Sequence, residues 1–375
     1  MLQTVFVYTL VMVSMVFCGI FASRRASLYP NQHISFCNWE VIYPLLFFAV
    51  VFGMRYDVGV DHLDYLYYYL TKSGMGRFDP IFKWITLFCR NNNLHFTFYF
   101  AIFAFIQVFL LFYTFKNERY LFPFLAFVLF TGQYFYHWMN VIRQDTAACI
   151  FLFASRYIAE KKFWKYFLCC LIACGFHKTA LLLFPVYPLL RGGRDFFKNI
   201  PLQLGILFIV SVVAILKFDI LRIFGPSIEQ FAVLLDYERY TEDVLYRFTD
   251  KTKSGVALYC FIVIDIIIIL YNIKMKDYFK NAAFKVFYNL YYFGTVTQIL
   301  CTNNLVLARP FRYFRYFMLI VSAHLLYYLY KHAKPSINTI VFFVLVFLFF
   351  ILFAAIIKNE PFTFFWQITN ILSKI

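Results

Sequence analysis

Long apolar runs follow one another along almost the whole sequence, and they restrict its possible folds more than any other feature. The first run extends from Thr4 to Ala22, and about 20 such residues cross the hydrocarbon layer of a bilayer as a helix. Apolar residues fill 63% of the 375 positions and charged residues only 14%, against about 25% charged in ordinary soluble domains. A soluble fold would leave much of this apolar surface in water. The sequence therefore predicts an all-α polytopic membrane protein and excludes a soluble enzyme.

The apolar runs predict about 12 transmembrane segments, within a range of about 10–14. The stretch 163–190 is interrupted by Gly175, His177 and Lys178, so we expect two short helices that meet near His177. All segments are expected to form a single integral membrane domain, residues 1–375. The other predicted spans are residues 4–22, 38–54, 95–115, 120–136, 140–158, 201–217, 255–273, 286–303, 314–330 and 338–357.

The basic residues predict the orientation of the chain in the membrane. They concentrate in the short loops 23–37, 159–163, 191–200, 274–285 and 331–336, and cytoplasmic loops carry an excess of Lys and Arg. The same bias accounts for the net charge of +16, so no nucleic-acid partner is expected. Both termini and two longer loops, 55–94 and 219–253, are then extracytoplasmic. Aromatic and charged residues alternate in loop 55–94, which is typical of helices that lie in the membrane interface.

The first cluster of polar residues begins where the span 38–54 ends. Arg55 is followed by Asp57 and Asp61, with Gly59 between the two carboxylates. An arginine here can bind a phosphate or carboxylate group with two parallel hydrogen bonds, and either aspartate can accept a proton from a hydroxyl group. A structural interpretation is also open, in which Asp61 and Asp64 cap a helix and Arg55 pairs with Asp57.

The second cluster opens the predicted span 140–158. Asn140, Arg143 and Gln144 are spaced i, i+3, i+4, so in a continuous helix they share one face. A face of amide and guanidinium donors inside a bundle needs acceptors. Pyrophosphate or sugar oxygens would serve, and so would Asp145 or another helix.

Two further clusters lie at the outer ends of predicted spans. His177 and Lys178 occupy the break within 163–190, where backbone groups need partners; His177 is either a structural residue or faces a cavity. Arg309, Arg312 and Arg315 are spaced by three and mixed with aromatic residues. They either extend to lipid head groups or form an anion-binding site, which we favour because arginines are uncommon on this side of a membrane.

Common catalytic motifs are missing from the sequence. It contains no Walker loop, HExxH, GxSxG or Rossmann glycine pattern, which are the signatures of nucleotide, zinc, serine-nucleophile and dinucleotide sites. We therefore expect neither a cofactor nor a metal ion.

Three of these stretches, in this order, resemble the EpsG family of bacterial exopolysaccharide proteins, which is related to the Wzy-type O-antigen and capsule polymerases. The matching stretches are Gly53–Asp61, Asn140–Gln144 and Phe176–Ala180, within a similarity over about residues 40–330. The family usually has Gly-Thr-Asp where this chain has Gly59-Val60-Asp61, and Ser at Thr179. The stretch from Arg309 to Tyr316 matches only loosely.

The resemblance implies a glycosyltransferase that polymerises lipid-linked oligosaccharide repeats without a metal or nucleotide. Donor and acceptor would be glycans on undecaprenyl pyrophosphate, at the outer face of the bacterial cytoplasmic membrane, within a GT-C-like helical bundle whose cavity opens outward. Chain-length regulator and flippase proteins are the implied protein partners. The expected catalytic residues are Asp61, Asp57 and His177, and the expected substrate-binding residues are Arg55, Asn140, Arg143, Gln144, Arg309, Arg312 and Arg315.

Two other functions remain open for the same residues. A flippase or exporter would move the lipid-linked glycan across the membrane, and an acyltransferase would modify it. A flippase should carry polar groups along a path through the membrane, whereas here the span centres hold only Asp265. The crowding of charge at one face favours catalysis there.

Overall fold

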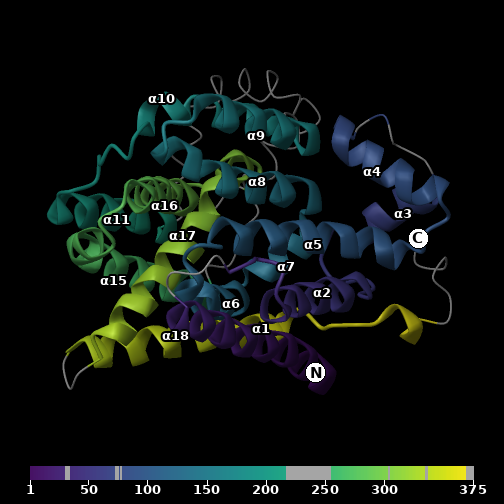
Figure 1. The fold of residues 1–375 in the computed structure, drawn as a ribbon, viewed down its shortest axis with the longest axis horizontal. Coiled ribbons are helices and arrows are strands. Elements are labelled where there is room, and N and C mark those ends of the chain that lie inside the picture. The colour runs from purple at the N-terminus through teal and green to yellow at the C-terminus, as the bar shows by residue number, and fades with distance from the viewer. Residues whose placement is uncertain are drawn as a thin grey trace.

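The computed structural model describes residues 1–29, 34–71, 76, 78–216, 255–302, 305–333 and 337–368. Within these ranges the chain is helical and has no named strand. The predicted outer loop 219–253 lies outside the described residues, so its interfacial helices stay a prediction. The α-helices (Figure 1) are α1 (Leu2–Leu28), α2 (Trp39–Gly53), α3 (His62–Thr71), α4 (Pro80–Asn91), α5 (Phe96–Thr114), α6 (Phe122–Thr131), α7 (Tyr134–Asn140), α8 (Ile142–Ala159), α9 (Phe163–Phe176), α10 (Val186–Leu190), α11 (Ile200–Ile215), α15 (Val256–Phe279), α16 (Ala282–Leu300), α17 (Leu305–Lys331) and α18 (Ile337–Asn359).

Four of the described helices, α1, α5, α15 and α18, are long and apolar enough to cross a membrane. Five further apolar segments are shorter: α2, residues 119–131, α9, residues 178–190 and α11. The chain is therefore a helical membrane protein, while the expected dozen spans and the GT-C-like arrangement stay predictions. The predicted break near His177 is confirmed, because α9 ends at Phe176 and the 3-10 helix η3 (Lys178–Leu183) begins directly after it.

Helix α8 lies at the centre of the bundle. It packs against α5, α9, α16 and α17, and most of its side chains are buried.

Small residues allow neighbouring helices to approach closely, as is usual in membrane bundles. At Gly53, for example, an added Cβ would lie 2.6 Å from the Cβ of Ala101, so this glycine fixes the end of α2 against α5.

Ion pairs hold the end of the bundle that the sequence predicts to be cytoplasmic. Arg25 pairs with Glu40 at 3.2 Å, and a second pair joins Arg156 to Glu118 at 3.3 Å. Asn281, which caps α16, donates a hydrogen bond to Glu118. The paired side chains come from the end of α1, the start of α2, the end of α8 and the segment before α6, and the orientation of this end in a membrane stays a prediction.

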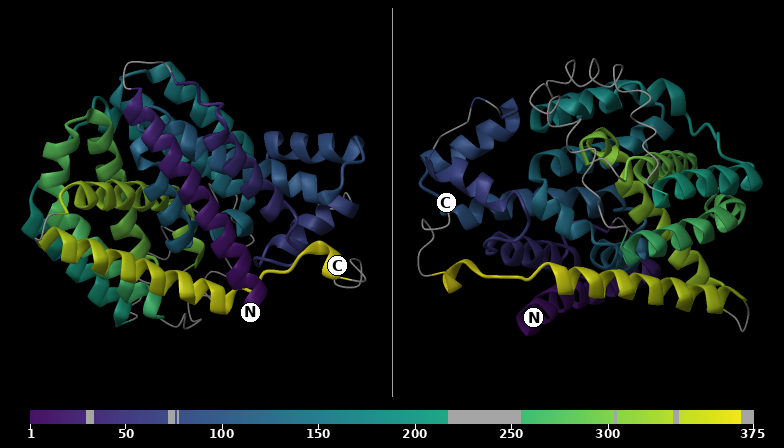
Figure 2. Two further views of the ribbon diagram at one scale, coloured as in Figure 1. Left: turned by 60° about the horizontal axis from the view of Figure 1, so that its bottom comes forward. Right: turned by 180° about the vertical axis from the view of Figure 1, so that it is seen from behind.

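Helices α3 and α4 lie side by side at the opposite end, away from α11 and α15 (Figures 1 and 2). They occupy the predicted outer loop 55–94. The segment after α18 runs to this same end (Figure 2, right). There Phe364 forms an isolated antiparallel bridge with Arg55, and Tyr56 N donates to Thr363 O at 2.8 Å.

Candidate functional site

Three interruptions of helical structure meet at the α3–α4 end and form the candidate site. The first is the segment 54–61 after α2, the second is Val141 between α7 and α8, and the third is His177 between α9 and η3. Non-helical backbone at membrane depth is tolerated only where protein or water satisfies its polar groups. The contacts described below connect the neighbourhoods of these interruptions through the side chains of Asn140 and Asp79.

Asn140 connects the first two interruptions. Its Oδ1 accepts a hydrogen bond from Asp61 N at 2.9 Å. Gly59 lies directly against it: its φ of 91° is in the left-handed region that favours glycine, and an added Cβ would be 3.2 Å from Asn140 Cα. The glycine between the two predicted carboxylates thus makes the turn that brings Asp61 to the start of α8.

The predicted common helix face of Asn140, Arg143 and Gln144 is wrong. Asn140 ends α7, and Val141, with φ −104° and ψ 59°, separates it from the first turn of α8, which holds Arg143 and Gln144. The three residues nevertheless serve one region, because Asn140 binds the backbone before α3 and Gln144 Nε2 donates to Arg309 O at 2.5 Å.

Arg143 is held by a carboxylate that the sequence analysis did not single out. Its Nη1 lies 3.2 Å from Asp79 Oδ2, and its guanidinium stacks over the Phe78 ring at 5.1 Å. Asp79 Oδ1 accepts a hydrogen bond from Lys178 N at 3.1 Å. Asp79 therefore connects the start of α4, the start of α8 and the break at His177. The dipeptide Asp79-Pro80, which opens the amphipathic helix α4, was the available sequence signal.

Asp61 faces a group of positive charges. Burial raises the pKa of its carboxyl above the usual value, whereas Arg309, Arg312 and Arg143 act to lower that pKa. Asp61 also occupies the position before α3, since Tyr65 N donates to its carbonyl. This is the position that the structural interpretation of Asp61 as a capping residue predicts.

His177 belongs to a chain of hydroxyl groups. Its Nδ1 lies 2.6 Å from Thr179 Oγ1, which in turn lies 2.8 Å from the Tyr313 hydroxyl of α17. The ring is within electrostatic reach of Arg143 and Arg309. The third interruption thus joins the same cluster, and Tyr313 is a second residue that the sequence analysis passed over, because it stands among other aromatic residues.

Arg55 lies in a different environment from the other predicted arginines. It is 1% exposed, and it donates to Phe52 O at 2.6 Å and to Met139 O at 3.0 Å. Its guanidinium also lies over the Phe100 ring at 4.7 Å. These contacts join the end of α2 to the end of α7, which is a structural arrangement.

The remaining two predicted residues lie at the edges of the cluster. Asp57 is exposed and has a φ of 53°. Arg315 lies about one helical turn after Arg312 in α17, and its guanidinium is 5.8 Å from the centre of the Tyr134 ring. Asp145, which is fully buried, is within electrostatic reach of both arginines.

We define the outer cluster as Asp61, Asp79, Arg143, His177, Arg309 and Arg312. Its cations can bind an anion of several oxygens, and Asp61 and His177 can accept a proton. Among the described residues, no group of three His, Cys, Asp or Glu side chains has the arrangement of a metal site.

A sequence model of the EpsG family matches residues 39–368 of the chain. That range includes every residue of the outer cluster. No curated protein and no solved structure matches the chain.

Proposed function

The chain belongs to the EpsG family, and from this premise we propose that it joins lipid-linked oligosaccharide repeat units into a polysaccharide. Membership of the family indicates a role of the polysaccharide-polymerase type. The finer proposal is a glycosyltransferase whose donor and acceptor glycans are both carried on undecaprenyl pyrophosphate. It would act at the outer face of the bacterial cytoplasmic membrane.

The observation that supports this proposal is that Arg143 of α8 and Arg309 and Arg312 of α17 are within electrostatic reach of Asp61. In the reaction, the bond between the anomeric carbon and the pyrophosphate oxygen breaks. Pyrophosphate leaves with increased negative charge, which arginines stabilise most strongly in the transition state. Arg143 is suited to this role because Asp79 and Phe78 hold its planar guanidinium in place.

The acceptor hydroxyl group attacks the anomeric carbon and loses its proton. Asp61 is the base we propose, because burial raises the pKa of its carboxyl and a higher pKa makes a stronger base near neutral pH. His177 is the alternative base, connected through Thr179 to the Tyr313 hydroxyl. The new glycosidic bond leaves the lengthened glycan on one lipid and frees the other.

Loss of the gene tests the function. We expect the deletion strain to retain glycans of a single repeat unit and to lack longer chains, since only polymerisation is removed. Gel profiles of surface glycans measure this directly. Absence of even single-unit material from the surface would instead support a flippase, and full-length glycans lacking acyl groups would support an acyltransferase.

A variant test connects the function to the outer cluster. The double substitution Arg309→Ala and Arg312→Ala should fail to restore long chains, while the protein still accumulates. Arg24→Ala is the matched control, since Arg24 is an exposed arginine near the C-terminal end of α1 and is not part of the outer cluster. Normal chain length in the double variant at normal protein level would contradict the proposed site.

A further inference from the structure

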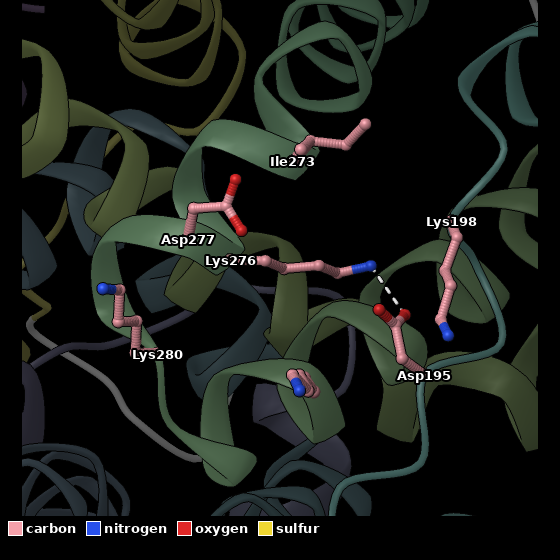
Figure 3. Close-up of a pocket in the computed structure, with 7 residues that line it drawn as sticks. Asp195, Lys198, Ile273, Lys276, Asp277 and Lys280 are labelled. Atoms are coloured by element: carbon pink, nitrogen blue, oxygen red, sulfur yellow. Dashed lines mark hydrogen bonds and ion pairs between the residues drawn. The ribbon is translucent and has the colours of Figure 1, made fainter.

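A polar cavity lies at the other end of the bundle, away from the outer cluster. It has a volume of about 450 Å³ and is formed by the segment before α11, the last turns of α15 and the first turn of α16 (Figure 3). Its location at helix ends, among residues of the predicted cytoplasmic loops, puts it near a membrane surface. Its charged lining consists of Asp195, Lys198, Lys276, Asp277, Lys280 and Lys285.

The cavity, which we call the lysine pocket, carries surplus positive charge. Four lysines face two aspartates. One lysine is already used within the protein, because Lys276 Nζ donates to Asp195 Oδ1 and to Phe197 O, both at 2.7 Å. In contrast, Lys198, Lys280 and Lys285 form no ion pair with any described residue. The pocket thus presents three lysines that can bind an added anion.

An exposed apolar surface leads from the lysine pocket along α15. Ile273 lines the pocket and is 50% exposed, and Leu270 and Ile266 are exposed on the same face of the helix. Leu202, in the first turn of α11, is exposed near the other wall. Exposed aliphatic side chains on a membrane-spanning helix contact lipid chains. The pocket therefore combines a charged cavity with an apolar surface, as an amphiphilic ligand requires.

We propose that the lysine pocket binds the phosphate headgroup of an anionic membrane lipid, whose acyl chains lie along α15. Basic pockets between helices at the cytoplasmic side of a membrane bind such headgroups, and lysines bind phosphate as mobile point charges without a fixed geometry. A soluble phosphate would use the lysines but not the apolar surface that Ile273 begins. The site is separate from the outer cluster, so the proposal does not depend on the reaction catalysed there.

The test measures lipid binding to the full-length protein purified in detergent, by native mass spectrometry with phosphatidylglycerol. We expect the double substitution Lys198→Gln and Lys285→Gln to weaken binding roughly 30-fold, if each lysine near the surface contributes as is usual for anionic lipids. Lys274→Gln with Lys331→Gln is the matched control. Both are exposed lysines from predicted cytoplasmic loops outside the pocket, and binding should change less than about twofold there.

Three results would overturn the proposal. The first is equal loss of binding in both double variants, because that indicates general attraction to basic residues. The second is phosphatidylcholine binding as tightly as phosphatidylglycerol. The third is inorganic phosphate displacing the lipid completely at millimolar concentration, which would assign the pocket to a soluble anion. Lys198→Gln alone provides a second variant, since Lys198 lies on an exposed segment before α11 and its replacement leaves the folded core intact.

Discussion

Arg143 and Asp79 allow a structural role to be separated from a role in the reaction. Their contact of 3.2 Å joins side chains that are 25% and 11% exposed, so it is a partly buried, charge-assisted pair. Hydrogen bonds of this kind contribute about 1.5–3 kcal/mol, and removing one partner leaves the other charge without compensation. Burial raises the Asp79 pKa, and Arg143 is the main group that lowers it.

The experiment is a double-mutant cycle of Arg143→Ala, Asp79→Asn and both together. For stability, we expect each single variant to lower the free energy of unfolding. The loss in the double variant should be smaller than the sum of the two single losses by about 1.5–3 kcal/mol, which is the coupling energy of the pair. For polymerisation, Arg143→Ala should lose about 10²–10³-fold in rate, the usual cost of one donor to a developing negative charge. The double variant should stay inactive, because restoring the fold does not restore the cation.

Two assays are needed, thermal unfolding in detergent and chain elongation on lipid-linked repeats. Arg143→Lys should retain stability better than activity, since lysine keeps the charge but loses the planar fork. Recovery of both stability and polymerisation in the double variant would refute the reasoning, because Arg143 would then serve only to neutralise Asp79.

Three further predictions concern the segment between α2 and α3. Asp61→Asn should reduce polymerisation more than Asp64→Asn. Burial raises the Asp61 pKa and a protonated base is inactive, so wild-type activity should begin to fall, as the pH decreases, at a pH above the usual pKa of aspartate. An elongation assay over a range of pH in which both variants lose activity equally would contradict this. Arg55→Ala should lower the yield of folded protein in size-exclusion chromatography, because two hydrogen bonds of about 1.5–3 kcal/mol each are lost; normal yield without activity would indicate substrate contact. Gly59→Ala should destabilise by about 1–3 kcal/mol, because its φ is 91° and the new Cβ would meet Asn140; an unchanged unfolding temperature would contradict this explanation.

The sequence predicted the membrane class and the grouping of polar residues more reliably than the role of each residue. The break at His177 could be predicted because Gly175, His177 and Lys178 interrupt an apolar run. The break at Val141 could not, because β-branched and apolar residues there give no signal of a turn. In the structure α7 ends at Asn140 and α8 begins at Ile142.

Arginines in similar sequence positions also have different partners in the structure. Arg55 and Arg143 both stand beside predicted span ends, yet the donors of Arg55 bind carbonyls, one of them on Met139, 84 residues away. Asp79 likewise acquires its importance from Arg143 and Lys178, which are 64 and 99 residues away. Such long-range partners are decided by the fold, and residue type and spacing do not contain them.

The segment after α18 has a consequence for biogenesis. Phe362 N donates to Thr4 Oγ1 at 2.9 Å, and Phe365 N donates to Met54 O at 3.0 Å. These partners lie near the beginning of the chain, but the ribosome makes residues 360–368 after every other described helix. Contacts of such sequence separation form late and slowly. The pairing of Arg55 with Phe364 therefore cannot form while α2 is being translated, and it completes only after α18 has been made. A nascent chain stalled before Phe362 would contain α1 to α18 and still lack the hydrogen bonds that join this segment to Thr4 and Met54.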